Sequence, residues 1–137
     1  MFENVVVGAT ETEGAARALS RALEIARASG GTLHVVNAFP PRRRLRSATP
    51  GQSRSPERRR NRGEALLAEF HQKAAWQSVP VEMHPAVSDP VEAITRVAAE
   101  TEADLIVVGS KGVDGTRHLS SVPRGVMDSA ECAVLVV

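Results

Sequence analysis

Short apolar runs alternate along this chain with stretches of helical periodicity. Val5 to Val7 form a continuous apolar run that ends at Gly8, and Leu105 to Val108 form another that ends at Gly109. Such runs are typical of strands that are buried on both faces of a parallel sheet. The stretches between them are long enough for right-handed crossover connections. The alternation therefore predicts an α/β fold with a doubly wound, open parallel sheet of five strands and helices on both faces.

The element order expected from this alternation is β-α-β-(loop)-α-β-α-β-α-β. Strands are expected at residues 5–7, 32–36, 79–87, 104–108 and 133–137. Helices are expected at residues 15–26, 63–74, 90–98 and 122–129. Pro80 and Pro85 interrupt the third strand, which favours an edge position. Asp89 followed by Pro90 is typical of a helix start.

Two loops of this chain follow strands at the place where such folds bind ligands. Ligands of doubly wound folds lie beyond the carboxyl ends of the strands, where the strand order reverses. If the first and fourth strands are neighbours, residues 8–12 and 109–121 face one crevice. Residues 109–125, GSKGVDGTRHLSSVPRG, form a glycine-rich loop that leads into a helix, which is a natural anion site. A loop that only turns the chain is the alternative.

Chain length and composition limit the possible classes. At 137 residues the chain is expected to form one domain, residues 1–137. The N-terminus, MFENVVVG, has no basic region before a long apolar stretch, and no window reaches the roughly 18 apolar residues of a membrane span. A cytoplasmic protein without membrane contact is therefore predicted. Cys132 is the only cysteine, which excludes an intrachain disulfide and favours a buried, inert thiol.

The segment from Pro41 to Arg62 differs from the rest of the chain. It carries nine arginines against a single acid, Glu57, and has almost nothing apolar to bury. Such a composition cannot offset its ordering entropy, so a mobile loop is predicted at about residues 41–62, with order returning at Gly63. A solvated linker is the favoured interpretation. Contact of Arg42 to Arg62 with nucleic acid phosphates is the alternative, without base stacking because no aromatic residues are interleaved.

The chain resembles the universal stress protein family, and four stretches carry the resemblance. In chain order they are VVVGATETEGAARALSRALEIARASGGTLHVV, SDPVEAITRVAAETEADLIVVGSKG, the G-x-x-G of Gly109 and Gly112, and SSVPRGVMDSAECAVLVV. Together they cover about two thirds of the chain. The resemblance implies a Rossmann-like sheet in the order 3-2-1-4-5 and a stress-response and signalling role. It also implies a homodimer formed through the last strand, Ala133 to Val137.

Many members of this family bind ATP, and others lack the site. Carried over by position, the resemblance implies that ATP or another adenine nucleotide contacts three groups of residues. The first group flanks the nucleoside, the second packs near adenine, and the third receives the phosphates. They are Gly8, Ala9 and Thr10; Val35 and Val108; and Gly109, Gly112, Ser120, Ser121 and Val122.

Three features depart from the ATP-binding pattern of the family. That pattern has nine residues between its G-x-x-G and the following Gly-Ser/Thr, whereas only seven separate Gly112 from Ser120. Ser120 stands where the pattern has glycine, so a Cβ lies where phosphate approaches the backbone. The aspartate usual after the first strand is absent, and Glu11 in that region would repel a triphosphate. A member that acts through dimerisation and partner contacts, without a nucleotide, is therefore an alternative.

The sequence contains no recognisable catalytic or metal-binding pattern. Its four histidines are His34, His71, His84 and His118. They fall on different expected elements with no pair at ligand spacing, so no metal site is predicted. No G-x-S-x-G elbow surrounds Ser120 or Ser121, and no catalytic residue is predicted. Weak ATP hydrolysis in the same crevice is the enzymatic alternative, although it lacks an evident base or metal-binding carboxylate.

Overall fold

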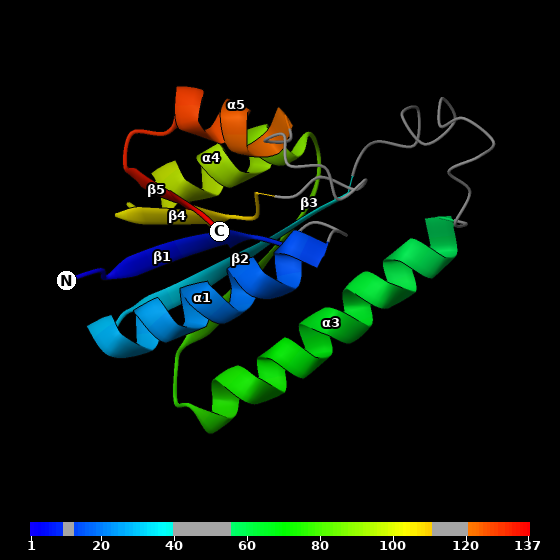
Figure 1. The fold of residues 1–137 in the computed structure, drawn as a ribbon, viewed down its shortest axis with the longest axis horizontal. Coiled ribbons are helices and arrows are strands. Elements are labelled where there is room, and N and C mark those ends of the chain that lie inside the picture. The colour runs from blue at the N-terminus through cyan, green and yellow to red at the C-terminus, as the bar shows by residue number, and fades with distance from the viewer. Residues whose placement is uncertain (10–12, 40–55, 111–120) are drawn as a thin grey trace.

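The fold is built on one parallel sheet. The computed structural model describes residues 1–9, 13–39, 56–110 and 121–137. Their five strands pair in the order β3-β2-β1-β4-β5, and all four pairings are parallel (Figure 1). The strands are β1 (Asn4–Gly8), β2 (Thr32–Phe39), β3 (Val81–Val87), β4 (Leu105–Val108) and β5 (Ala133–Val136). The predicted doubly wound sheet and its strand order are confirmed.

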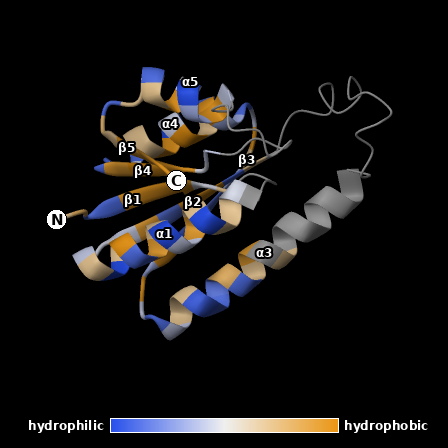
Figure 2. Cartoon of the chain, in the orientation of Figure 1, coloured by the Kyte–Doolittle hydropathy of each residue, from blue (hydrophilic) through white to orange (hydrophobic). Residues whose placement is uncertain are grey.

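Helices on both faces of the sheet enclose two apolar cores. The helices are α1 (Glu13–Ser29), α3 (Pro56–Trp76), α4 (Pro90–Glu100) and α5 (Ser121–Ser129). α1 and α3 cover one face, and α4 and α5 cover the other (Figure 1). Successive strand residues point to opposite faces, so Val5 and Val7 pack toward α1 while Val6 packs toward α4. Burial on both sides explains why these strands are unbroken apolar runs (Figure 2).

α3 begins earlier than the sequence predicts. The expected loop extends to Arg62, but the structure is helical from Pro56, so the prediction is wrong for residues 56–62. The loop was expected because this stretch has no apolar residue to bury. Arginine and glutamate nevertheless have good helix propensity, and proline suits the first turn of a helix. The rest of the expected loop, residues 41–55, lies outside the described residues.

Three helices end in the same backbone pattern. The residue after the cap has a positive φ in each: Gly30 after α1 (+68°), Ser78 after α3 (+55°) and Glu102 after α4 (+52°). After α4, the Glu102 N–H donates to the Ala99 carbonyl and the Ala103 N–H donates to the Ala98 carbonyl, which is a Schellman motif. Only α1 has glycine at the strained position, so the other two ends carry some backbone strain.

The edges of the sheet are β3 and β5. The position of β3 confirms the prediction from its prolines, because an edge strand tolerates the missing N–H of Pro85. α4 starts as predicted, with the Asp89 carboxylate accepting from the Glu92 N–H at 3.4 Å and Pro90 in the first turn. Among the residues that the structure describes, no helix is long and apolar enough to cross a membrane.

Candidate functional site

β1 and β4 meet at the centre of the sheet, where the strand order reverses. The chain leaves β1 through α1 toward β2, and it enters β4 from α4 on the other side. Val5 to Val7 pair with Leu105 to Val107, so the carboxyl ends of the two strands are neighbours. This confirms the expectation that the first and fourth strands adjoin at the switch point. The segments that follow Gly8 and Gly109 therefore start side by side.

Close packing explains both glycines at these strand ends. A Cβ at Gly109 would lie 2.9 Å from the backbone carbonyl carbon and oxygen of Gly14 in α1. A Cβ at Gly8 would lie 2.7 Å from Cδ1 of Ile94 in α4. Atoms of a folded protein do not approach a Cβ so closely, so a side chain at either position requires a shift. At Gly109 the backbone of α1 would have to move, whereas at Gly8 the tip of the Ile94 side chain could move instead. The first turn of α1 thus packs directly on the end of β4, with or without a ligand.

The structure brings some of the predicted nucleotide contacts together and separates others. Gly8, Ala9 and Gly109 lie at the adjoining ends of β1 and β4. Val35 and Val108 are almost fully buried, and they belong to the cores on opposite faces of the sheet. They therefore do not form one surface for an adenine ring. Three further candidates lie outside the described residues: Thr10, Gly112 and Ser120.

Part of the hydrogen-bonding capacity of the crevice is used within the sheet. The Ala9 N–H donates to a carbonyl of β2 at 2.9 Å, and the Ser110 N–H donates to the carbonyl of the C-terminal residue at 2.7 Å. The N-terminus of α5 is another source of donors for an anion. Ser121 is exposed there, Val122 is half-buried, and the first turn holds no acidic residue. An anion at this helix end would meet no side-chain carboxylate from that turn.

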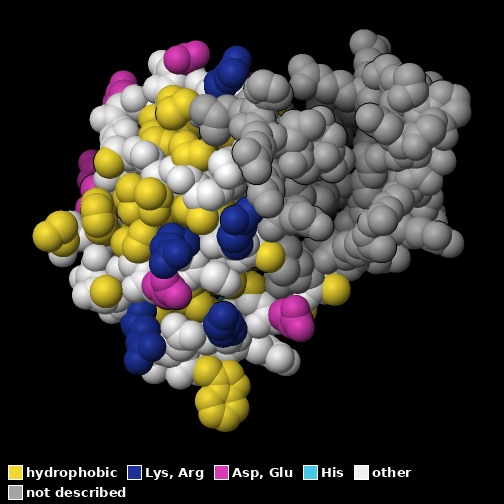
Figure 3. Space-filling model, viewed as in Figure 1, with side chains coloured by type: hydrophobic (Ala, Val, Ile, Leu, Met, Phe, Trp, Pro, Cys, Tyr) yellow, Lys and Arg dark blue, Asp and Glu magenta, His cyan; other side chains and the backbone are white. Residues whose placement is uncertain are grey.

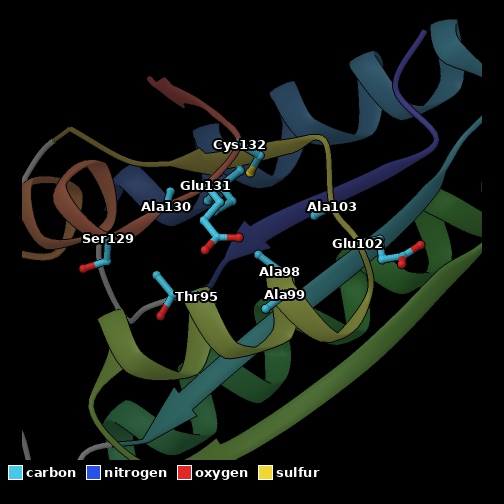
Figure 4. Close-up of a pocket in the computed structure, with 10 residues that line it drawn as sticks. Thr95, Ala98, Ala99, Glu102, Ala103, Ser129, Ala130, Glu131 and Cys132 are labelled. Carbon is cyan, nitrogen blue, oxygen red and sulfur yellow. The ribbon is translucent and has the colours of Figure 1, made fainter.

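A cleft of about 500 Å³ lies away from this crevice, between α4 and the turn that joins α5 to β5. It is at the amino end of β4, opposite to the predicted site (Figure 4). Its lining includes apolar Ala98 and Ile106, while the exposed carboxylates of Glu102 and Glu131 add negative charge. These two carboxylates would repel an anionic nucleotide. We therefore do not assign the cleft to nucleotide binding.

Cys132 also lines this cleft and is half-buried rather than buried. Burial raises the pKa of its thiol, and the Asp104 carboxylate adds to this effect. A raised pKa leaves little of the thiolate that nucleophilic attack requires. The cysteine therefore has the properties of a packing residue.

Two of the four histidines meet in the structure, so the expectation that no histidines pair at ligand spacing is wrong. His34 of β2 and His84 of β3 lie with 3.0 Å between Nδ1 and Nε2, respectively. Oε2 of Glu82 lies 3.2 Å from the same Nδ1. The sequence signal was the Glu-x-His spacing, which places both residues on one face of a strand. The sequence does not show the register of β2 against β3, which brings His34 next to this pair. His71 is exposed on α3, and His118 lies outside the described residues.

The whole chain, residues 1–137, matches the family model described as the universal stress protein family. A universal stress protein of Mycobacterium tuberculosis is 32% identical over 143 residues, which cover 99% of this chain and 96% of the relative. One from Thermus aquaticus is 33% identical, with 100% and 99% covered. A crystal structure of a universal stress protein in complex with cAMP has 31% sequence identity and a TM-score of 0.71, covering 99% of this chain and 96% of that one. The family resemblance found in the sequence is confirmed.

Proposed function

We propose that this chain, which belongs to the universal stress protein family, is a stress-response and signalling module that binds an adenine nucleotide beyond β1 and β4. One observation carries the proposal. Two glycine-ended strands adjoin at the switch point of the sheet, in a chain 31% identical to a universal stress protein in complex with cAMP. Ligands of doubly wound folds bind at this position.

In the proposed site, backbone groups and small side chains make the contacts. Gly8, Ala9 and Thr10 flank the nucleoside. Val35 and Val108 are buried, so we assign them to the support beneath the crevice instead of to direct contact with adenine. The phosphate is received by the glycine loop and the start of α5, at Gly109, Gly112, Ser120, Ser121 and Val122.

A nucleotide with a single phosphate group fits this chain better than a triphosphate. The phosphate loop is two residues shorter than the ATP-binding pattern, and Glu11 adds a negative charge after β1. The aspartate that would help to hold a metal on a triphosphate is absent. One phosphate needs fewer donors and no metal, and a helix N-terminus favours such an anion. We therefore rank cAMP and AMP ahead of ATP as ligands.

Isothermal titration of the purified protein with cAMP, AMP and ATP tests this proposal. We expect saturable binding of a monophosphate, weaker binding of ATP, and a higher melting temperature in the presence of the tighter ligand. Ser121→Ala should weaken binding about fivefold, the typical effect of one lost hydrogen bond. Ser129→Ala, at the other end of the same helix, is the matched control. Absence of both heat and melting shift at millimolar nucleotide would refute nucleotide binding.

β5 presents an apolar edge that a second copy of the chain would cover. Val134, Leu135 and Val136 are each only half-buried. Figure 3 shows hydrophobic side chains gathered on the part of the surface where β5 and the C-terminus lie in Figure 1. An unpaired apolar edge strand favours association. We therefore propose a homodimer that forms through Ala133 to Val137.

Light scattering at micromolar concentration tests the dimer. The unsubstituted protein should have twice the mass of one chain, and Val134→Lys should be monomeric because a charge would be buried at the interface. Val87→Lys is the matched control, since Val87 is 75% exposed on the opposite edge strand β3. A monomeric unsubstituted protein, or monomers produced equally by both substitutions, would contradict the proposal.

A binding module that uses no nucleotide is the second candidate. It is favoured by the close packing at Gly8 and Gly109, because this packing explains the two glycines without a ligand. The hydrogen bond from the Ala9 N–H to β2 also supports this candidate, because it occupies a backbone donor of the crevice. The titration above separates the two candidates, since the second predicts a dimer with no nucleotide response.

A further inference from the structure

A compact group of ligand-type side chains lies on β2 and the edge strand β3. We call His34, Glu82 and His84 the histidine–glutamate cluster. Glu82 and His84 alternate along β3 and therefore share a face, while His34 lies directly across from Glu82 in the β2–β3 register. His34 is the third residue of β2, and Glu82 and His84 are the second and fourth residues of β3. The cluster therefore lies on β2 and β3, whereas the proposed nucleotide crevice lies beyond the carboxyl ends of β1 and β4. Neither the proposed function nor the family comparison uses these residues.

The spacing of the three ligand atoms matches the coordination sphere of a small transition metal. His34 Nδ1 lies 3.0 Å from His84 Nε2 and 3.2 Å from Glu82 Oε2. The third distance, from His84 Nε2 to Glu82 Oε2, is 3.8 Å. Tetrahedral zinc with bonds of about 2.0–2.1 Å places its ligand atoms about 3.3 Å apart. We propose that His34, Glu82 and His84 form a divalent metal site, with Zn²⁺ as its ion.

Asn4 of β1 holds His34 in the orientation that metal binding needs. His34 Nε2 lies 3.1 Å from Asn4 Oδ1. An amide oxygen only accepts hydrogen bonds, so Nε2 carries the proton and Nδ1 presents its lone pair to the cluster. Metal-binding histidines are usually oriented by such a hydrogen bond from the second ring nitrogen. The Asn4 backbone N–H is itself fixed by the Asp104 carboxylate at 3.2 Å.

Hydrogen bonding alone leaves the cluster incompletely satisfied. With the proton of His34 on Nε2, its Nδ1 and the Glu82 carboxylate are both acceptors, yet they lie 3.2 Å apart. Nε2 of His84 can supply one proton, which serves only one of these two acceptors. A cation between the three atoms satisfies all of them together.

The cluster is open on one side, so an ion can enter. His34 is buried, with only 4% of its surface exposed, whereas the Glu82 side chain is 62% exposed and the His84 side chain 25% exposed. Three protein ligands leave the fourth tetrahedral position to water. Two imidazoles and one carboxylate favour zinc over calcium or magnesium, which prefer oxygen ligands. The geometry therefore points to a site that exchanges its metal with solvent.

Titration of the full chain with Zn²⁺, followed by calorimetry, tests this proposal. We expect one equivalent to bind, and Co²⁺ in its place should show the visible absorption of a four-coordinate ion. Loss of a ligand in His84→Gln or Glu82→Gln should weaken binding by at least about 100-fold. Asn4→Ala should weaken it about 10–100-fold, the usual effect of an outer-shell change. Both ligand positions are partly exposed, so these variants should keep the fold, which circular dichroism checks.

Two matched controls each remove a zinc-binding side chain outside the cluster. His71→Gln deletes an exposed histidine on α3, and Cys132→Ser deletes the only thiol. Both should bind Zn²⁺ as the unsubstituted protein does. The proposal is overturned if no Zn²⁺ binds at high micromolar concentration, or if Glu82→Gln and His84→Gln bind it unchanged. In either case the cluster is a hydrogen-bonded group only, and the nucleotide titration is unaffected.

Discussion

Two regions of the sheet are built from different chemical groups. At the carboxyl ends of β1 and β4, glycines allow α1 and α4 to pack closely. On β2 and the edge strand β3, side chains of the histidine–glutamate cluster converge instead. The first region resembles an anion site and the second a cation site. One small sheet thus has two candidate sites with opposite charge preference.

This difference also explains why only one of the two candidate sites can be recognised in the sequence. The glycines of the carboxyl end stand in short motifs that a single stretch of chain reveals, as in Gly109 and Gly112. The cluster joins His34 to residues 48 and 50 positions further on, and no local pattern links them. A site built from backbone groups can therefore be predicted from a local motif. A site built from side chains on two strands depends on the register of those strands.

The largest expected effect comes from filling the packed carboxyl end. Gly109→Ala should lower the free energy of unfolding by about 2–3 kcal/mol, because the new Cβ would meet the backbone of Gly14. Urea denaturation measures the change. Ser110→Ala, one position further on, should stay within about 0.5 kcal/mol. A similar small loss for Gly109→Ala would show that α1 can shift away, so that packing alone does not require glycine at this position.

The histidine–glutamate cluster should make stability depend on pH through His34. Burial lowers the pKa of His34 below 6.5 in the folded state, and the charge of His84 acts in the same direction, while Glu82 opposes both. The unfolded chain therefore takes up a proton at higher pH than the folded one. The contribution of His34 to the free energy of unfolding is therefore fully present above pH 6.5. It is lost as the pH falls from 6.5 toward the lowered pKa of the folded state.

Urea denaturation between pH 8 and pH 5, with chelator present, measures this effect. A single proton contributes a slope of at most about 1.4 kcal/mol per pH unit. His34→Gln should remove that slope, whereas His71→Gln, with an exposed histidine, should retain it. Equal slopes for His34→Gln and the unsubstituted protein would mean that His34 titrates alike in both states.

Glycine at a strained helix end should have a smaller and stabilising effect. Glu102 follows α4 with a φ of +52°, in a position where glycine is preferred. Glu102→Gly should raise the free energy of unfolding by about 0.5–1 kcal/mol, after allowance for the extra freedom of the unfolded chain. Thermal denaturation detects this change. Gly30→Ala, in the same position after α1, should act in the opposite direction, and the two results must differ in sign.

The smallest expected effects test whether the two sites are independent. His84→Gln should change the affinity for cAMP by less than about twofold, because substitutions at sites that share no partner are usually additive. Ser121→Ala should likewise leave the Zn²⁺ titration unchanged. Calorimetry of each variant with both ligands provides the comparison. A reduction of both affinities by one substitution would show coupling through the sheet.

Much of the fold is predictable because its causes are local. Val5 to Val7 and Leu105 to Val108 are buried on both faces, so they are apolar without alternation. Asp89 and Pro90 begin α4 as expected, and Pro85 lies on an edge strand. The start of α3 at Pro56 was missed, since the prediction rested on what residues 56–62 can bury and not on their helix propensity.

The candidate sites were only partly predictable. Sequence motifs placed Gly8 and Gly109 at neighbouring strand ends, which the β1–β4 pairing confirms. They also grouped Val35 with Val108 near one ligand, although the register of β2, β1 and β4 puts these residues on opposite faces of the sheet. The meeting of His34 and His84 was missed because the β2–β3 register is a property of the folded sheet.

The sequence by itself determined the family and the order of strands and helices along the chain, and it placed Gly8 and Gly109 at the ends of strands. These properties follow from burial, periodicity and backbone freedom, which act over a few neighbouring residues. Only the tertiary structure decided which side chains share a face and which meet across strands. A shift of one residue in a strand would turn His34 to the other side of the sheet. For that reason the histidine–glutamate cluster exists only in the folded protein.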